Sequence, residues 1–272
     1  MRSSWLVVLI LSVFMVGCAS QHDRNEMTES VFYQKAHQQL VKKRFNTAID
    51  DLKELKARFP YSEYAEQAQL DLVYAYYQTA DFAEAIAAAK YYLDHYPSSE
   101  QIDYVLYFQG LSNFRLTESA FERIIKRNIA ARDLTNKRDA FNDFAELVER
   151  FPDSQYAPDA RSRMVYIRHL MAQENLEAAR YYAKREAFVS AVARAQRVVE
   201  HYQGTPSVEE ALAIMSRSYR ALGQSELADK SRQVLAHNWP KSAYLNSARD
   251  RVEISWWPQE KTWLQLLTFD LL

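Results

Sequence analysis

The chain has 272 residues, and its 34 basic and 35 acidic side chains give a net charge of −1 at pH 7. This balance lacks the basic excess of a general nucleic-acid binder, so no nucleic-acid partner is expected. A single cysteine excludes an intramolecular disulfide. Only four glycines occur, and the strand-turn pairs Asn-Gly and Asp-Gly are absent. The composition therefore favours an all-α fold.

The N-terminal segment has the features of a secretory signal. An apolar run over residues 5–16 follows the basic Arg2. It is shorter than the roughly 20 residues that a membrane span needs, but it fits a signal peptide. Cys18 follows this run after the small residue Gly17 in "FMVGCAS", which resembles a bacterial lipobox. A plain signal peptide, or a buried N-terminal helix with a chance cysteine, is the alternative.

The lipobox interpretation predicts a signal peptide over residues 1–17 and an acylated Cys18, carrying an S-diacylglycerol and an N-palmitoyl group. Residues 18–30 would then form the lipidated cysteine and a short tether. Two or more acyl chains anchor a protein stably to a membrane. Ala19 follows the cysteine in place of an aspartate that would resemble an inner-membrane retention signal. Sorting to the outer membrane is therefore favoured.

A repeat begins after this tether. Five short segments each contain an aromatic residue, usually a proline, and then a serine or threonine that can cap the next helix. Eleven residues before every one of these aromatics stands an alanine. The aromatics and their alanines are Phe59 and Ala48, Tyr96 and Ala85, Phe151 and Ala140, Tyr202 and Ala191, and Trp239 and Ala228.

This pattern is that of the tetratricopeptide repeat, a pair of antiparallel helices with small residues where they touch. The last copy shows it most clearly, with Ser216, Tyr219, the turn residue Gly223 and Ala228 before Pro240. We predict an all-α solenoid of about five helix-turn-helix repeats over residues 31–246. Such arrays bury a continuous core and present an extended concave surface to proteins and peptides.

The spacing of the aromatics predicts two longer repeats in the middle of the array. Extra residues fall within 123–138 and 169–188, and both segments are expected to be extended helices because neither is rich in Pro, Gly or Ser. After the fifth repeat, residues 247–272 are expected to form a capping helix and an apolar tail. The tail, residues 255–272, either covers the last repeat or docks on a partner or membrane.

The sequence offers no recognisable catalytic or metal site. Six histidines are scattered without the spacing of zinc ligands, and neither a nucleophile elbow nor a phosphate loop occurs. We expect a non-catalytic protein with no cofactor and no metal. The histidines are His22, His37, His95, His169, His201 and His237.

Three stretches carry a closer resemblance: "FYQKAHQQLVKKRFNTAIDDLKELKARFP", "ARDLTNKRDAFNDFAELVERFPDSQYA" and "ARYYAKREAFVSAVAR". Together with the lipobox and the extended middle repeats, they resemble the BamD (ComL) family of outer-membrane assembly lipoproteins. The resemblance implies a lipid-anchored protein at the periplasmic face of the outer membrane. It also implies binding to the periplasmic domains of BamA, with BamC- and BamE-type lipoproteins nearby, and to unfolded outer-membrane β-barrel precursors.

Four residues are candidates for these contacts. Tyr33, Tyr74 and Tyr77 are expected on the first helices of their repeats, where rigid aromatic rings with polar tips suit extended peptides. The alternative is that they pack between helices. Arg194 follows Ala191 by three residues and should reach the surface, where the resemblance places the BamA-facing region. A solvated arginine is the simpler interpretation.

A second function stays open at this point. A periplasmic repeat lipoprotein could instead scaffold enzymes of cell-wall synthesis or division. Such a protein would more often carry a coiled-coil segment before its repeats, and residues 21–31 are too short for one. The barrel-assembly interpretation is therefore preferred.

Overall fold

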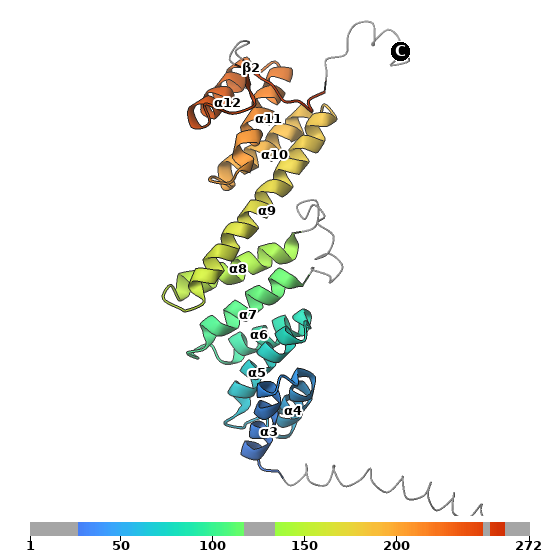
Figure 1. Ribbon diagram of the computed structural model, residues 1–272, viewed down its shortest axis with the longest axis vertical. Coiled ribbons are helices and arrows are strands. Elements are labelled where there is room, and N and C mark those ends of the chain that lie inside the picture. Colours follow the sequence, from blue (N-terminus) through green and yellow to red (C-terminus); the bar gives the residue numbers. More distant parts are fainter. Residues whose placement is uncertain (1–26, 117–133, 247–250, 259–272) are drawn as a thin grey trace, which may run out of the picture. The chain divides into compact units, whose positions relative to one another are not determined.

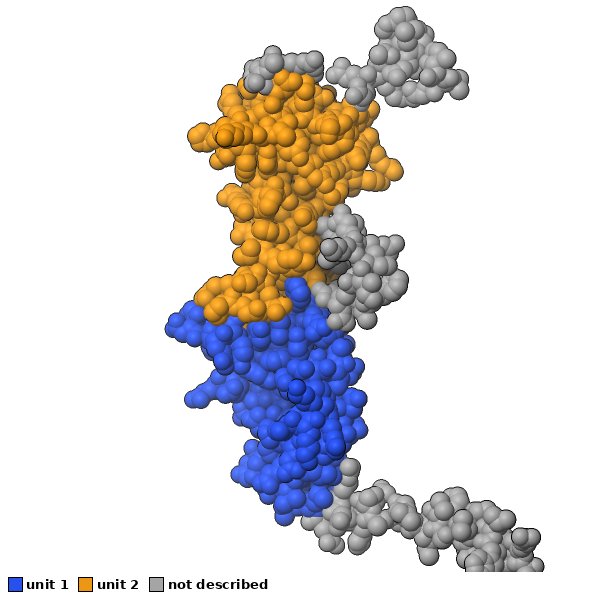
Figure 2. Space-filling model, in the orientation of Figure 1, with its two compact units in different colours: residues 1–117, 150–156 blue, residues 118–149, 157–272 orange. Residues whose placement is uncertain are grey.

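The computed structural model describes residues 27–116, 134–246 and 251–258 (Figure 1). Within these residues it contains ten α-helices and one hairpin of two-residue strands, so the predicted all-α class is confirmed. The chain divides into two compact units (Figure 2). Unit 1 comprises residues 1–117 and 150–156, and unit 2 comprises residues 118–149 and 157–272.

Unit 1 is a run of antiparallel helix pairs. Neighbouring helices pack on each other, and the first helices of successive pairs also touch, α3 on α5 and α5 on α7. This is the packing that a tetratricopeptide pattern predicts. The helices are α3 (Glu29–Val41), α4 (Phe45–Arg58), α5 (Ala65–Gln78), α6 (Phe82–His95) and α7 (Ile102–Arg115).

In unit 2, helices α9 to α12 pack in the same way. Its α9 has 28 residues, which confirms the expected extension within 169–188. Most of the other surplus segment, residues 123–133, lies outside the described residues, and its last residues begin α8. The helices are α8 (Thr135–Arg150), α9 (Ala157–Lys184), α10 (Phe188–His201), α11 (Ser207–Ala221) and α12 (Ser225–Asn238).

The segment after α12 differs from the expected capping helix. Strand β1 (Leu245–Asn246) pairs antiparallel with β2 (Arg251–Val252), and a turn follows in which the Trp257 N–H donates to the Ile254 carbonyl at 3.0 Å. Val252, Ile254 and Trp257 are buried against the core of unit 2. Helix formation over residues 251–258 would turn part of this apolar set away from that core. The described part of the segment therefore covers the last repeat without being helical.

The predicted alanines form the seams between helices. All five are fully buried: Ala48, Ala85, Ala191 and Ala228 lie on the second helix of a pair within one unit, and Ala140 lies on α8. At the last seam the hydroxyl of Ser216 on α11 donates to the carbonyl of Ala228 on α12 at 2.9 Å. Small side chains thus let two backbones approach closely, as the pattern predicted.

The predicted aromatics end the second helix of each pair. Phe59, Tyr96, Tyr202 and Trp239 are the C-terminal caps of α4, α6, α10 and α12. The serine that follows does not cap the next helix directly. Instead its hydroxyl accepts the N–H two residues ahead, as from Tyr64 to Ser62 at 3.0 Å. This short turn leads the chain into the next first helix.

The turns inside the pairs use left-handed backbone. Gly223, the predicted turn glycine, has φ +74°, and the equivalent residues Lys43, Ala80 and Glu186 have φ of 57°, 64° and 59°. Each turn is a Schellman motif, in which the next N–H donates to a carbonyl five residues back, as from Arg44 to Gln39 at 2.8 Å. Three of these turns therefore hold non-glycine residues in a conformation that glycine adopts at less cost.

We predict that Ala80→Gly stabilises the protein. Relief of the left-handed alanine should outweigh the added flexibility of the unfolded chain and raise the free energy of unfolding by about 0.5–1 kcal/mol. Ala87→Gly on the exposed face of α6 is the matched control and should lower it by about 1 kcal/mol. Urea denaturation followed by circular dichroism measures both. Equal destabilisation by the two substitutions would contradict this account of the turn.

Candidate protein-binding surfaces

The first candidate surface lies in unit 1 on α3, α5 and α7. Tyr33 on α3 is half-buried, and its hydroxyl donates to Asp71 Oδ2 on α5 at 3.0 Å. The Tyr33 ring stacks on Tyr64, with centroids 5.0 Å apart and planes at 19°. Burial and the neighbouring Asp71 charge raise the pKa of Tyr33. The hydroxyl therefore remains a neutral donor.

Asp71 is the polar centre of this part of unit 1. Its side chain is mostly buried, and it also accepts from Gln67 Nε2 at 3.3 Å. His37 Nδ1 lies 3.4 Å from the same oxygen that Tyr33 contacts. A buried carboxylate needs such partners, because an unpaired charge in an apolar environment is costly. The ring of Tyr33 is thereby held in one orientation.

Tyr74 and Tyr77 lie further along α5 and meet at one ring. Both contact Phe108 on α7 edge to face, with centroids 5.7 Å and 5.2 Å away. Arg115 Nη1 donates to the Tyr77 hydroxyl at 3.4 Å. Edge-to-face pairs of this kind contribute about 0.5–1.5 kcal/mol beyond burial. The two tyrosines are half-buried, so each ring both packs between helices and keeps an accessible part.

Further aromatic rings contact Phe108. Tyr104 and Tyr107 lie 4.7 Å and 5.7 Å from it, and Tyr107 stacks on Tyr156 at 4.7 Å. Burial raises the pKa of Tyr104. We name the whole set the aromatic face. It consists of Tyr33, Tyr64, Tyr74, Tyr77, Tyr104, Tyr107, Phe108 and Tyr156.

The second candidate surface lies in unit 2 around Arg194 on α10. Arg194 is half-exposed and comes three residues after the seam residue Ala191, as the sequence predicted. Its guanidinium makes neither a hydrogen bond nor an ion pair with another described residue. It is thus available for a contact from outside the chain.

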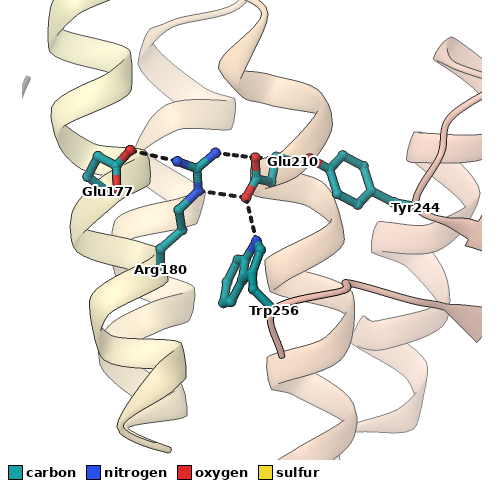
Figure 3. Close-up of polar contacts among 5 residues, drawn as sticks. All are labelled: Glu177, Arg180, Glu210, Tyr244 and Trp256. Atoms are coloured by element: carbon teal, nitrogen blue, oxygen red, sulfur yellow. Dashed lines mark hydrogen bonds and ion pairs between the residues drawn. The ribbon is translucent and has the colours of Figure 1, made fainter. Parts of the chain in front are cut away.

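A buried glutamate on α11 contacts both α9 and the segment after α12 in unit 2 (Figure 3). Arg180 on α9 donates through two nitrogens to both carboxylate oxygens of Glu210 on α11, from Nε to Oε1 at 2.7 Å. Tyr244 donates to Glu210 at 3.0 Å, and the Trp256 indole N–H donates to it at 3.2 Å. The remaining Arg180 nitrogen donates to Glu177 at 2.6 Å. Glu210 therefore ties the C-terminal segment to two helices.

The electrostatics of this network favour the charged carboxylate. Burial alone would raise the pKa of Glu210, but the hydrogen bonds and charge of Arg180, with those of Tyr244 and Trp256, lower it overall. The same contacts with Glu210 raise the pKa of Arg180. Burial and the Glu210 charge raise the pKa of Tyr244 to about 12. All three groups keep their ordinary charge states at neutral pH.

Aromatic and cation–π contacts also hold the C-terminal segment on unit 2. Trp257 stacks on Phe188 of α10 with centroids 5.7 Å apart and planes at 8°. Lys184 and Arg217 lie over the rings of Trp256 and Trp257 at 5.4 Å and 5.3 Å. The start of the apolar tail is therefore packed onto its own unit, and residues 259–272 lie outside the described residues.

Comparisons with known proteins identify the family. A family model described as "Outer membrane lipoprotein", YfiO, matches residues 25–235. The chain belongs to this family. It is 36% identical over 259 residues to "Outer membrane protein assembly factor BamD" of Neisseria meningitidis serogroup A, covering 93% of this chain and 97% of the relative. Proteins of the same name from Pasteurella multocida and Vibrio cholerae are 32% and 31% identical, covering 86% and 88% of this chain and 90% and 99% of the relatives. The resemblance to the BamD family is thereby confirmed.

The described site residues lie in two places in this family member. Tyr33, Tyr74 and Tyr77 lie together on the aromatic face of unit 1, and Arg194 lies in unit 2. Cys18 lies outside the described residues. Among the described residues no three His, Cys, Asp or Glu side chains meet as metal ligands. No described helix is long and apolar enough to cross a membrane.

Sequence reasoning missed Phe108 and Glu210. "YVLYFQG" carries a signal for the first, because Tyr104 and Phe108 are four residues apart and fall on one helix face. Glu210 carries no such signal, since its partner Trp256 is 46 residues away in the sequence.

We predict that Glu210→Gln loosens the C-terminal segment. The change leaves Arg180 without its charged partner and should lower the free energy of unfolding at pH 7 by roughly 1.5–3 kcal/mol. Because the folded state lowers the pKa of Glu210 below its ordinary value of 4.5, the stabilisation is complete above that pH. It is lost as the pH falls through the folded value. The difference between variant and wild type should shrink accordingly in acid.

Glu226→Gln is the matched control, because Glu226 pairs with Lys230 on the exposed face of α12. Guanidinium denaturation at a series of pH values, followed by tryptophan fluorescence, measures both variants. The control should leave the unfolding curve almost unchanged. If the two substitutions lower the free energy of unfolding equally, Glu210 does not hold the C-terminal segment on α9 and α11 in the way that its hydrogen bonds indicate.

Proposed function

We propose that this chain is an outer-membrane protein assembly factor, acting as a non-catalytic subunit of the β-barrel assembly complex. The observation that carries the proposal is the similarity to proteins bearing that name, which extends over 97% of the Neisseria relative's length. Because the similarity covers 93% of this chain, it includes helices of both units. Helical repeats act by binding, which suits an assembly factor better than an enzyme.

The proposed location rests on the lipobox around Cys18. Cys18 would carry the diacylglycerol and palmitoyl chains and hold the protein at the periplasmic face of the outer membrane. Multiple acyl chains anchor stably, whereas one chain binds only marginally. The family description "Outer membrane lipoprotein" supports this assignment.

The aromatic face is the proposed site for unfolded barrel precursors. Tyr33, Tyr74 and Tyr77 present partly exposed rings whose orientations are fixed by Asp71, Phe108 and Arg115. Rings that are already ordered lose little conformational entropy when they bind. Extended precursor segments with alternating aromatic side chains would pack against such a face while their backbones bond to tyrosine hydroxyls.

Unit 2 is the proposed site for the other subunits. Arg194 would pair with a carboxylate on the periplasmic domains of BamA, since its guanidinium has no charged partner among the described residues. A planar guanidinium with five donors suits such a carboxylate. BamC- and BamE-type lipoproteins would lie nearby.

We predict that a photoreactive phenylalanine analogue at Tyr33, Tyr74 or Tyr77 captures barrel precursors. The probe should crosslink to a newly secreted outer-membrane protein in intact cells, because all three positions lie on the aromatic face. The same probe at Tyr61 is the control: Tyr61 is in unit 1 but is 100% exposed and outside the face. Circular dichroism of each purified variant checks folding.

Crosslinks at the three face positions and none at Tyr61 would support the site. Crosslinks of equal yield at Tyr61 would mean that contact with precursors is unspecific. Absence of precursor crosslinks from all three correctly folded variants would contradict the proposed site and leave the tyrosines as packing residues.

A further inference from the structure

A cavity of about 310 Å³ lies on unit 1 between α4, α5 and α6, away from the aromatic face. It is widely open to solvent. Its walls combine two amines, two phenol rings, one amide and one carboxylate. The side chains that carry the argument are Lys53 and Lys56 of α4, Gln69 and Tyr76 of α5, and Glu84 and Tyr91 of α6.

Lys56 is a fixed, half-buried cation in this cavity. Its ammonium donates to Gln69 Oε1 and lies 4.3 Å from the centre of the Tyr91 ring. Gln69 is 2% exposed, and its own amide N–H donates to the Ala88 carbonyl at 2.8 Å, which fixes where its oxygen points. No carboxylate of a described residue forms an ion pair with Lys56. Burial accordingly lowers the pKa of its ammonium.

Lys53 adds a second positive charge at the same opening. Its ammonium lies 5.5 Å from the centre of the Tyr76 ring. The neighbouring Tyr76 hydroxyl raises the pKa of Lys53, and the charges of Glu84 and Asp50 add to this. Only Glu84 contributes a negative charge to the lining, so the cavity holds an excess of positive charge that a ligand could neutralise.

We propose that this cavity binds a phosphate group. An ammonium is a compact point charge with three donors. The ammonium groups of Lys53 and Lys56, on neighbouring turns of α4, can both donate to the oxygens of one phosphate. The faces of Tyr76 and Tyr91 would cover the organic part of a phosphate ester. The volume is at the lower end of the range for small-molecule sites, and it is enough for a phosphate headgroup.

Two sources supply this chemistry, an anionic phospholipid headgroup and a soluble phosphate ester. Residues 19–28 separate Cys18 from α3, and ten extended residues span at most about 33–36 Å. A membrane that holds Cys18 would therefore keep unit 1 near its headgroups. The lipid source depends on the anchor proposed above, whereas the phosphate site itself does not.

The test uses residues 18–272, prepared without acyl chains so that no anchor binds the vesicles. Calorimetry measures the Kd for inorganic phosphate. Co-sedimentation measures binding to phosphatidylethanolamine vesicles with and without phosphatidylglycerol. Lys53→Gln/Lys56→Gln should weaken phosphate binding roughly ten-fold. Lys42→Gln/Lys90→Gln removes the same charge from exposed positions of unit 1 and should change the Kd less than about two-fold.

Vesicle binding that requires phosphatidylglycerol and is lost in Lys53→Gln/Lys56→Gln would support a lipid headgroup. Phosphate binding without vesicle binding would support a soluble ester. The proposal is overturned if the wild type does not bind phosphate, if both double variants lose it equally, or if acetate binds as tightly. Circular dichroism checks folding, and the exposed single variant Lys53→Gln provides the comparison if the double variant does not fold.

Discussion

The close approach of two helices at a buried alanine is the constraint on which the rest of the structure depends. Each of the five seam alanines is fully buried. A larger side chain there would force the helices apart, and overpacking of this kind costs about 1–3 kcal/mol. Once the seam fixes the spacing and register of a pair, the aromatic that ends the second helix and the serine turn after it fix where the next pair begins.

This arrangement determines which side chains can act. The small residues of the second helices lie at the contacts with the first helices. The first helices α3, α5 and α7 carry tyrosines from different repeats on one face. Two buried carboxylates are paired across helices, Asp71 with Tyr33 and Glu210 with Arg180. Such pairing is required because buried polar groups without partners are costly. The same pairs orient the aromatic face of unit 1 and hold the C-terminal segment of unit 2.

The sequence predicted those features that repeat along the chain. The seam alanines, the aromatic caps and the extended α9 could all be identified because they recur at fixed spacing or lengthen one interval. The left-handed conformation of Lys43, Ala80 and Glu186 could not be predicted, because these residue types do not indicate a positive φ. Of the four equivalent turns, only the one at Gly223 contains a glycine. The hairpin after α12 and the bond from Trp256 to Glu210 depend on tertiary contacts that no local pattern encodes.

The most direct test of the central claim is affinity purification of this protein from its own membranes in mild detergent, with mass spectrometry of the co-eluting chains. The account predicts recovery of a large outer-membrane barrel protein with periplasmic domains, and a reduced yield of it with Arg194→Glu. Recovery of cell-wall synthases without any barrel protein would contradict the assembly function and leave only the helical-repeat fold in place.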